Sequence, residues 1–194
     1  FRRVLFRSSI NFKYLWSPFK FIGRQLQFLQ SRVSIVILFI SSLILVGFCF
    51  ANKNILPQSA LMAVGLMSIA LIIILFAFAH RKSAITAWIY LLVAHLFIVA
   101  AIFANAPHIN TIETVFYVSG ILPAFALGYY CLQKIKSIDN DITLNRFHGY
   151  VYEQENTGLL FLFSCIGMLG FPITAAFVGI DVFFTYVHHS QPLL

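Results

Sequence analysis

The feature that most constrains this chain is one long apolar run, residues 158–188, with Gly170, Phe171 and Pro172 near its middle. As a continuous helix the run would extend for about 46 Å at 1.5 Å per residue, whereas the hydrocarbon core of a bilayer is about 30 Å thick. Pro172 has no N–H for the carbonyl of Met168, and its ring clashes with that carbonyl. We therefore expect a helix that breaks at Gly170, Phe171 and Pro172. The alternatives are a kinked structural span, or a span followed by an interfacial segment.

The composition indicates a helical membrane protein. Hydrophobic residues make up 60% of the chain and charged residues 10%, and the mean hydropathy is +0.89. A soluble domain of this length does not carry so much apolar surface, and solid apolar runs are not the alternating pattern of a membrane barrel. We predict an all-α polytopic membrane protein with about five transmembrane helices, the last of them broken at Gly170 to Pro172.

Four further apolar segments predict the other spans, at residues 33–51, 58–79, 84–104 and 112–132. Basic residues precede the first span, follow the second and follow the fourth. The positive-inside rule then places the N-terminal side and the polar loop 134–156 in the cytoplasm. The formal net charge of +7 therefore follows the topology rather than nucleic-acid binding. We expect a multi-pass protein of a bacterial inner or plasma membrane, in contact with the lipid bilayer.

The N-terminal residues divide into two segments before the first span. Residues 1–8, FRRVLFRS, resemble a translated sequencing adapter and are expected to be an artefact. Residues 9–32 place apolar side chains at helical spacing between basic ones, which predicts an amphipathic helix in the interface. Residues 33–194 form the transmembrane domain. The absence of an initiator Met and the apolar C-terminal residues lead us to expect a fragment cut at both ends.

Two ionisable residues within apolar segments are candidates for proton relay. His95 is at the middle of the third span, where an ionisable group is costly and marks a functional site by default, and histidine titrates near neutrality. The alternative is a neutral imidazole bonded to a backbone carbonyl or to Tyr90. Asp181 follows Gly179 in the outer half of the broken run. Its alternative is an interfacial acid with Thr185 as its partner.

Pro123, in the fourth span, predicts a second helix break beside a wet internal path, with a simple kink as the alternative. The three cysteines are scattered through apolar segments, which predicts no metal site and no disulfide. The sequence has no Gly-rich phosphate loop, nucleophile elbow or zinc motif. We therefore expect no cofactor, no catalytic residue and no bond-making chemistry of its own.

Residues 166–179, IGMLGFPITAAFVG, resemble the late broken helix of antiporter-like proton-conducting membrane subunits. That family includes the chain 5 and chain 4 type subunits of proton-pumping NADH:quinone oxidoreductase and the large subunits of multi-subunit sodium/proton antiporters. It also includes the energising membrane subunits of inorganic-carbon uptake complexes. Residues 94–98, AHLFI, and 127–132, LGYYCL, are more weakly similar to the inorganic-carbon branch.

The resemblance implies inverted repeats, with this chain as a piece of the C-terminal half, and proton translocation coupled to other subunits of a membrane complex. In the family a Lys or Glu usually occupies the position of Ile180, and Asp181 matches the acid that often follows. Either Asp181 serves alone or the coupling of this member is altered. The alternative function is a non-conducting membrane subunit that scaffolds a respiratory or inorganic-carbon uptake complex. A solute permease would need polar pocket residues that the sequence lacks.

Overall fold

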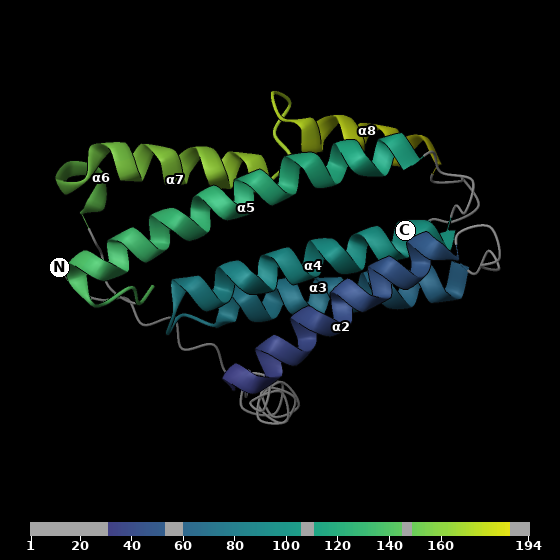
Figure 1. Cartoon of the computed structure of the whole chain (residues 1–194), viewed down its shortest axis with the longest axis horizontal. Helices are drawn as coiled ribbons and strands as arrows, with labels where there is room; N and C mark the ends of the chain where they lie inside the picture. The colour runs from purple at the N-terminus through teal and green to yellow at the C-terminus, as the bar shows by residue number, and fades with distance from the viewer. Residues whose placement is uncertain (1–30, 53–59, 106–110, 145–148, 187–194) are drawn as a thin grey trace, which may run out of the picture. The chain divides into compact units, whose positions relative to one another are not determined.

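The computed structural model describes residues 31–52, 60–105, 111–144 and 149–186. All regular structure in these ranges is α-helical, in agreement with the predicted fold class (Figure 1). The helices are α2 (Arg32–Ala51), α3 (Ala60–Ala79), α4 (Ala84–Asn105), α5 (Thr111–Asp139), α6 (Tyr150–Glu153), α7 (Glu155–Met168) and α8 (Ala175–Tyr186). The predicted segments 1–8 and 9–32 lie outside the described residues, except for Ser31 and Arg32.

Within the described ranges, four helices, α2 to α5, are long and apolar enough to cross a membrane. The first three agree within a few residues with the predicted spans. The run 158–188 is divided between α7, which has 14 residues, and α8, which has 12. At 1.5 Å per residue these helices are about 21 and 18 Å long, so each alone is shorter than the hydrocarbon core. The chain is a multi-pass helical membrane protein whose last apolar run is broken, as predicted.

The chain divides into two compact units, residues 1–38 and residues 39–194, and α2 crosses the boundary between them. In the first unit the start of α2 is capped by Ser31, whose Oγ accepts a hydrogen bond from the Ser34 N–H at 3.1 Å. This side-chain oxygen satisfies one of the free N–H groups of the first helical turn. The second unit contains all the other helices.

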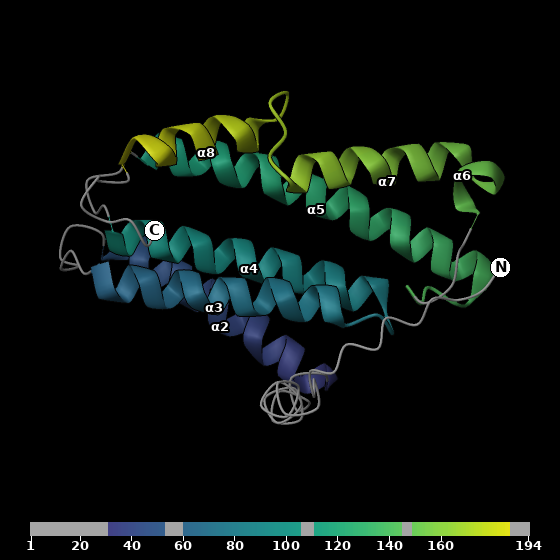
Figure 2. The same cartoon turned by 180° about the vertical axis from the view of Figure 1, so that it is seen from behind.

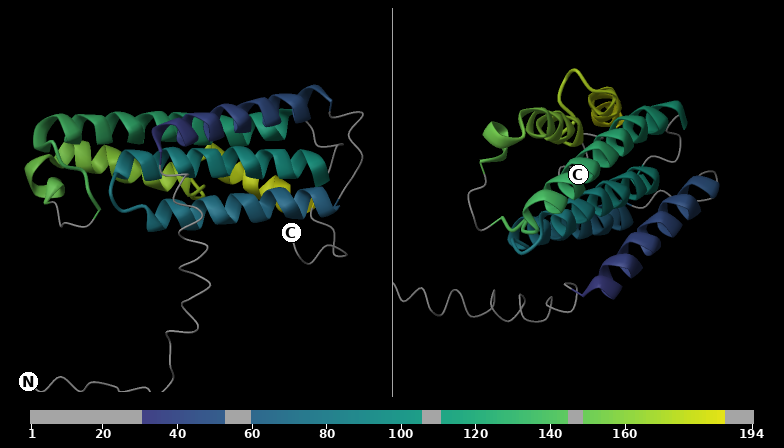
Figure 3. Two further views of the ribbon diagram at one scale, coloured as in Figure 1. Left: turned by 90° about the horizontal axis from the view of Figure 1, so that it is seen from below. Right: turned by 60° about the vertical axis from the view of Figure 1, so that its left-hand side comes forward.

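Within the second unit α3 packs along α4, and the two helices lie side by side in both views of Figure 3. The buried hydrophobic residues of α3 are Ile73 and three small residues seven positions apart, Ala63, Ala70 and Ala77. Small side chains let two backbones approach closely, which is how helices associate in membranes. On α4, twelve of the 22 residues are buried. It is therefore the central helix of this unit.

Helix α5 lies along α7 and then along α8, with the short α6 preceding α7 (Figures 1 and 2). Glycines allow the close approach. A Cβ at Gly120 would collide with the backbone of Ala176 on α8, and a Cβ at Gly167 would lie 2.6 Å from the Ala124 Cβ. The two half-helices are thus held against one continuous helix.

The polar stretch predicted as the loop 134–156 is partly helical, because α5 continues to Asp139. Ile135 is buried while Lys134 and Lys136 are exposed, so this end of α5 is amphipathic. Asn140 then takes a left-handed conformation with φ of 55°, as residues that end helices often do. The following segment is joined to the turn after α3, since the Leu144 N–H donates to the Arg81 carbonyl at 2.9 Å.

Candidate functional site

The break after α7 is a complete helix-capping motif. Gly170 has φ of +64°, a left-handed conformation that glycine adopts without the steric cost of a Cβ. Its N–H donates to the Gly167 carbonyl at 3.1 Å, and the Phe171 N–H donates to the Ile166 carbonyl at 3.2 Å. These two bonds define the Schellman motif. The helix therefore ends because of Gly170, and Pro172 follows where no helical N–H is needed.

The connection between the half-helices is short and ordered by its own hydrogen bonds. Both the N–H and the Oγ1 of Thr174 donate to the Phe171 carbonyl at 2.8 Å. The Thr174 carbonyl accepts a bond from the Phe177 N–H at 3.0 Å inside the first turn of α8. Phe171 and Ile173 are exposed. Several N–H groups of this segment are thus paired locally, although the segment is not helical.

His95, at the middle of α4, joins this break to α5. Its Nδ1 lies 2.7 Å from the hydroxyl oxygen of Tyr117 on α5. The imidazole also makes a hydrogen bond with the backbone of Met168, the last residue of α7. His95 itself is half-buried, and Tyr117 is 2% exposed. The predicted relay histidine therefore faces neighbouring helices and contacts the break directly.

The carbonyls of the last turn of α7 explain why His95 binds there. The Leu169 N–H donates to the Cys165 carbonyl at 3.0 Å, and the capping bonds satisfy the next two carbonyls. In a continuous helix the Met168 carbonyl would accept from residue 172, but Pro172 has no N–H to donate. Within the apolar interior an unpaired carbonyl would lower the stability of the fold by roughly several kcal/mol. His95 is the group that satisfies Met168.

These partners assign the protonation of the neutral imidazole. One ring nitrogen of neutral histidine donates and the other accepts. If the ring donates to the Met168 carbonyl, Nδ1 accepts the Tyr117 O–H. The result is a continuous donor-to-acceptor series from Tyr117 through His95 to Met168. Tyr117 and His95 can exchange a proton along their hydrogen bond when the imidazole is transiently charged, whereas the Met168 carbonyl only accepts a hydrogen bond and fixes the ring.

Tyr117 is held in position by close packing of α8. A Cβ at Gly179 would lie 2.6 Å from the Tyr117 Cβ, so only glycine permits this contact. The partner of His95 is thus not Tyr90, the alternative that the sequence predicted. Tyr90 instead packs edge-on against Phe76, with ring centroids 5.2 Å apart and an interplanar angle of 87°. The signal that could have found Tyr117 was a tyrosine within the next predicted span, residues 112–132.

Pro123 does not break its helix, in contrast to our expectation. It lies inside α5, which is continuous from Thr111 to Asp139. Membrane helices tolerate an internal proline when neighbouring helices pack around it, and here Gly120 and Ala124 on either side of Pro123 pack against Ala176 of α8 and Gly167 of α7. Of the two helix breaks predicted, the described residues therefore contain only the one at Gly170.

Asp181 lies on α8 but is not brought to His95. It is exposed, whereas Gly179 packs on Tyr117. Two residues advance a helix by about 200°, so Asp181 lies on the face opposite this contact. Ile180 is the residue that covers the break, because a Cβ at Gly170 would meet the Ile180 Cδ1. Where the resemblance anticipates a charge, an apolar side chain thus closes over the break.

The described residues contain no group of three His, Cys, Asp or Glu side chains placed to hold a metal ion. The arrangement is defined instead by one imidazole, one phenol and one main-chain carbonyl where three helices meet. The fold and this site define a multi-pass helical membrane protein with a polar junction at a helix break. Comparison of the chain with protein-family models, with curated proteins and with solved structures gives no match.

Proposed function

We propose that this chain is a proton-conducting membrane subunit, or part of one, of the antiporter-like type that residues 166–179 resemble. The observation that carries the proposal is the hydrogen-bonded series from Tyr117 through His95 to the Met168 backbone at the helix break. An ionisable side chain inside a membrane span, bonded on both sides within the protein, is typical of a proton relay.

In this function His95 is the group that takes up and releases the proton. Tyr117 passes a proton through its hydroxyl, and the Met168 carbonyl orients the imidazole. Non-helical backbone at membrane depth is tolerated where it is buried or lines water, and at this break Ile180 covers Gly170, so water reaches the relay only when this side chain moves. Asp181, exposed on α8, serves as an acid at one end of the path. The proton flux would be coupled to other subunits of a membrane complex.

The test is proton uptake by proteoliposomes that contain the full-length protein, driven by a potassium diffusion potential and followed with a pH-sensitive dye. Tyr117→Phe keeps the ring and removes the hydroxyl that bonds His95. We expect it to lower the flux at least tenfold relative to the unaltered protein. Tyr130→Phe, at an exposed position of the same helix, is the matched control and should keep the flux. Equal flux in both variants would contradict the proposal.

The second candidate is a non-conducting subunit that scaffolds its partners. The observation that favours it is Ile180, an apolar side chain over the break at the position where the family carries a charge. In that case the bond from His95 to Met168 serves stability alone. The unaltered protein would then conduct no protons above the lipid background, while Tyr117→Phe would still lower its thermal stability.

A further inference from the structure

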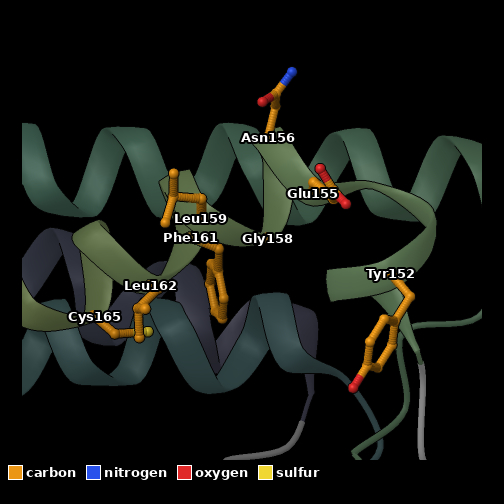
Figure 4. A pocket seen from close by; sticks show the side chains of 8 residues that line it. All are labelled: Tyr152, Glu155, Asn156, Gly158, Leu159, Phe161, Leu162 and Cys165. Atoms are coloured by element: carbon orange, nitrogen blue, oxygen red, sulfur yellow. The ribbon is translucent and has the colours of Figure 1, made fainter.

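A groove on the outer side of α7 has no part in the polar junction. It has a volume of about 620 Å³ and is open at the surface of the protein. Figure 4 shows its lining, with Tyr152 on α6 at one end and Leu162 and Cys165 on α7 at the other. The short helix α6 forms one wall, because it turns back beside the start of α7.

The groove is polar at one end and apolar along the rest of its length. Glu155 and Asn156 lie at the start of α7, next to α6, and both are exposed. From there the lining is almost entirely apolar, through Leu159 and Leu162 to Cys165. The same division, a polar end and an apolar body, describes a phospholipid at the boundary of a bilayer.

The length of the groove matches one leaflet. Helix α7 advances about 15 Å from Glu155 to Cys165 at 1.5 Å per residue, which is half of the ~30 Å hydrocarbon core. The polar loop that precedes Glu155 places this end of α7 at the headgroups, whichever side of the membrane that is. An acyl chain that starts at Glu155 would therefore end near the bilayer midplane.

The charge at the polar end selects the headgroup. Glu155 is the one charged side chain among the residues that line the groove. A carboxylate attracts an ammonium and repels a headgroup with net negative charge. A primary ammonium donates up to three hydrogen bonds, as lysine does, and bonds between ionised partners are the stronger kind.

We propose that this groove binds one phospholipid whose headgroup ends in a primary ammonium, that is, a phosphatidylethanolamine. The ammonium binds the carboxylate of Glu155, and one acyl chain lies along Leu159, Leu162 and Cys165. This site is independent of proton conduction, since it shares no residue with the junction of His95, Tyr117 and Met168.

The test is native mass spectrometry of the full-length protein after delipidation in detergent and addition of phosphatidylethanolamine, phosphatidylcholine or phosphatidylglycerol. Leu162→Trp fills the groove and should weaken phosphatidylethanolamine binding at least tenfold. Phe163→Trp is the matched control, because Phe163 is 56% and Leu162 55% exposed, yet only Leu162 lines the groove. We expect this control to bind like the unaltered protein.

A second pair of variants tests the headgroup. Glu155→Gln should remove the preference for phosphatidylethanolamine over phosphatidylcholine, and Glu153→Gln, outside the lining, should keep it. Three results would overturn the proposal: equal binding by the two tryptophan variants, phosphatidylglycerol binding as tightly as phosphatidylethanolamine, or a dimer that only Leu162→Trp dissociates. The last would show that a second copy of the chain occupies the groove.

Discussion

The Nδ1 of His95 lies 2.7 Å from the hydroxyl oxygen of Tyr117, and this bond joins the middle of α4 to the second turn of α5. The two rings are 5.9 Å apart at an interplanar angle of 57°. Through Met168 the same imidazole reaches the end of α7. One side chain thus connects the central helix of the second unit to the point where the last apolar run is broken.

The contact between α5 and α8 should depend on Gly120. In Gly120→Ala the new methyl group collides with the backbone of Ala176, so the helices must separate, at a cost of about 1–3 kcal/mol in the free energy of unfolding. Gly65→Ala is the control, because nothing lies within 4 Å of a Cβ there and alanine is the better helix former by about 1 kcal/mol. Thermal unfolding in detergent measures both, and an equal response of the two variants would contradict the packing.

His80, just beyond the end of α3, should make stability depend on pH. Burial lowers the pKa of its imidazole, and the neighbouring Lys82 lowers it further. At acidic pH the unfolded chain then binds more protons than the folded one. The contribution of His80 to the free energy of unfolding is therefore fully present above about pH 6.5, and it is lost as the pH decreases through the pKa of the folded state.

The measurement for His80 is the midpoint of thermal unfolding across this pH range. His80→Phe keeps a ring that can stack on Phe76, whose centroid lies 6.2 Å from that of His80, and cannot titrate. We expect the variant to lose the decrease at acidic pH. An identical pH profile for the variant and the unaltered protein would rule out His80 as its source.

The sequence predicted the helices and the break, because both follow from local rules. A solid apolar run of spanning length is helical whatever its neighbours are, and Gly170 with Pro172 stops a helix by backbone geometry alone. The partner of His95 depends instead on how α4 and α5 are rotated about their axes. That rotation is fixed by contacts distant in sequence, such as Gly179 against Tyr117.

The error at Pro123 has the same origin. A proline removes one hydrogen bond from a helix, and whether the helix bends or continues is decided by what packs around it. Asp181 and Ile180 are adjacent in sequence, and about 100° of rotation separates them on α8. Only the packing shows that Ile180 covers Gly170 while Asp181 is exposed.

The basic residues predict that the polar segment 134–156 faces the cytoplasm. Ser137, exposed near the end of α5, is a suitable position for a single cysteine in a protein whose native cysteines are replaced. A membrane-impermeant maleimide applied to intact cells should leave Ser137→Cys unlabelled and should label Asn52→Cys at the other end of the spans. Labelling of the first and protection of the second would reverse the orientation.

The variant Asp181→Asn tests whether the carboxylate on α8 belongs to the proposed proton path. Asp181→Asn keeps the shape and hydrogen bonding of the side chain but cannot release a proton, so we expect most of the proton uptake by vesicles to be lost while the amount of folded protein is unchanged. Ile180→Glu in that variant places a carboxylate over the break at Gly170 and should restore part of the uptake. Full activity of Asp181→Asn alone would remove Asp181 from the path.

The most direct test of the proposed relay is the proton flux of the His95→Gln variant. Glutamine retains a donor for the Met168 carbonyl and an acceptor for Tyr117, but it does not titrate, so it separates conduction from structure. With equal amounts of folded protein in proteoliposomes, relay through His95 predicts a flux at least tenfold below that of the unaltered protein, with a similar thermal midpoint. An undiminished flux in His95→Gln would contradict the relay.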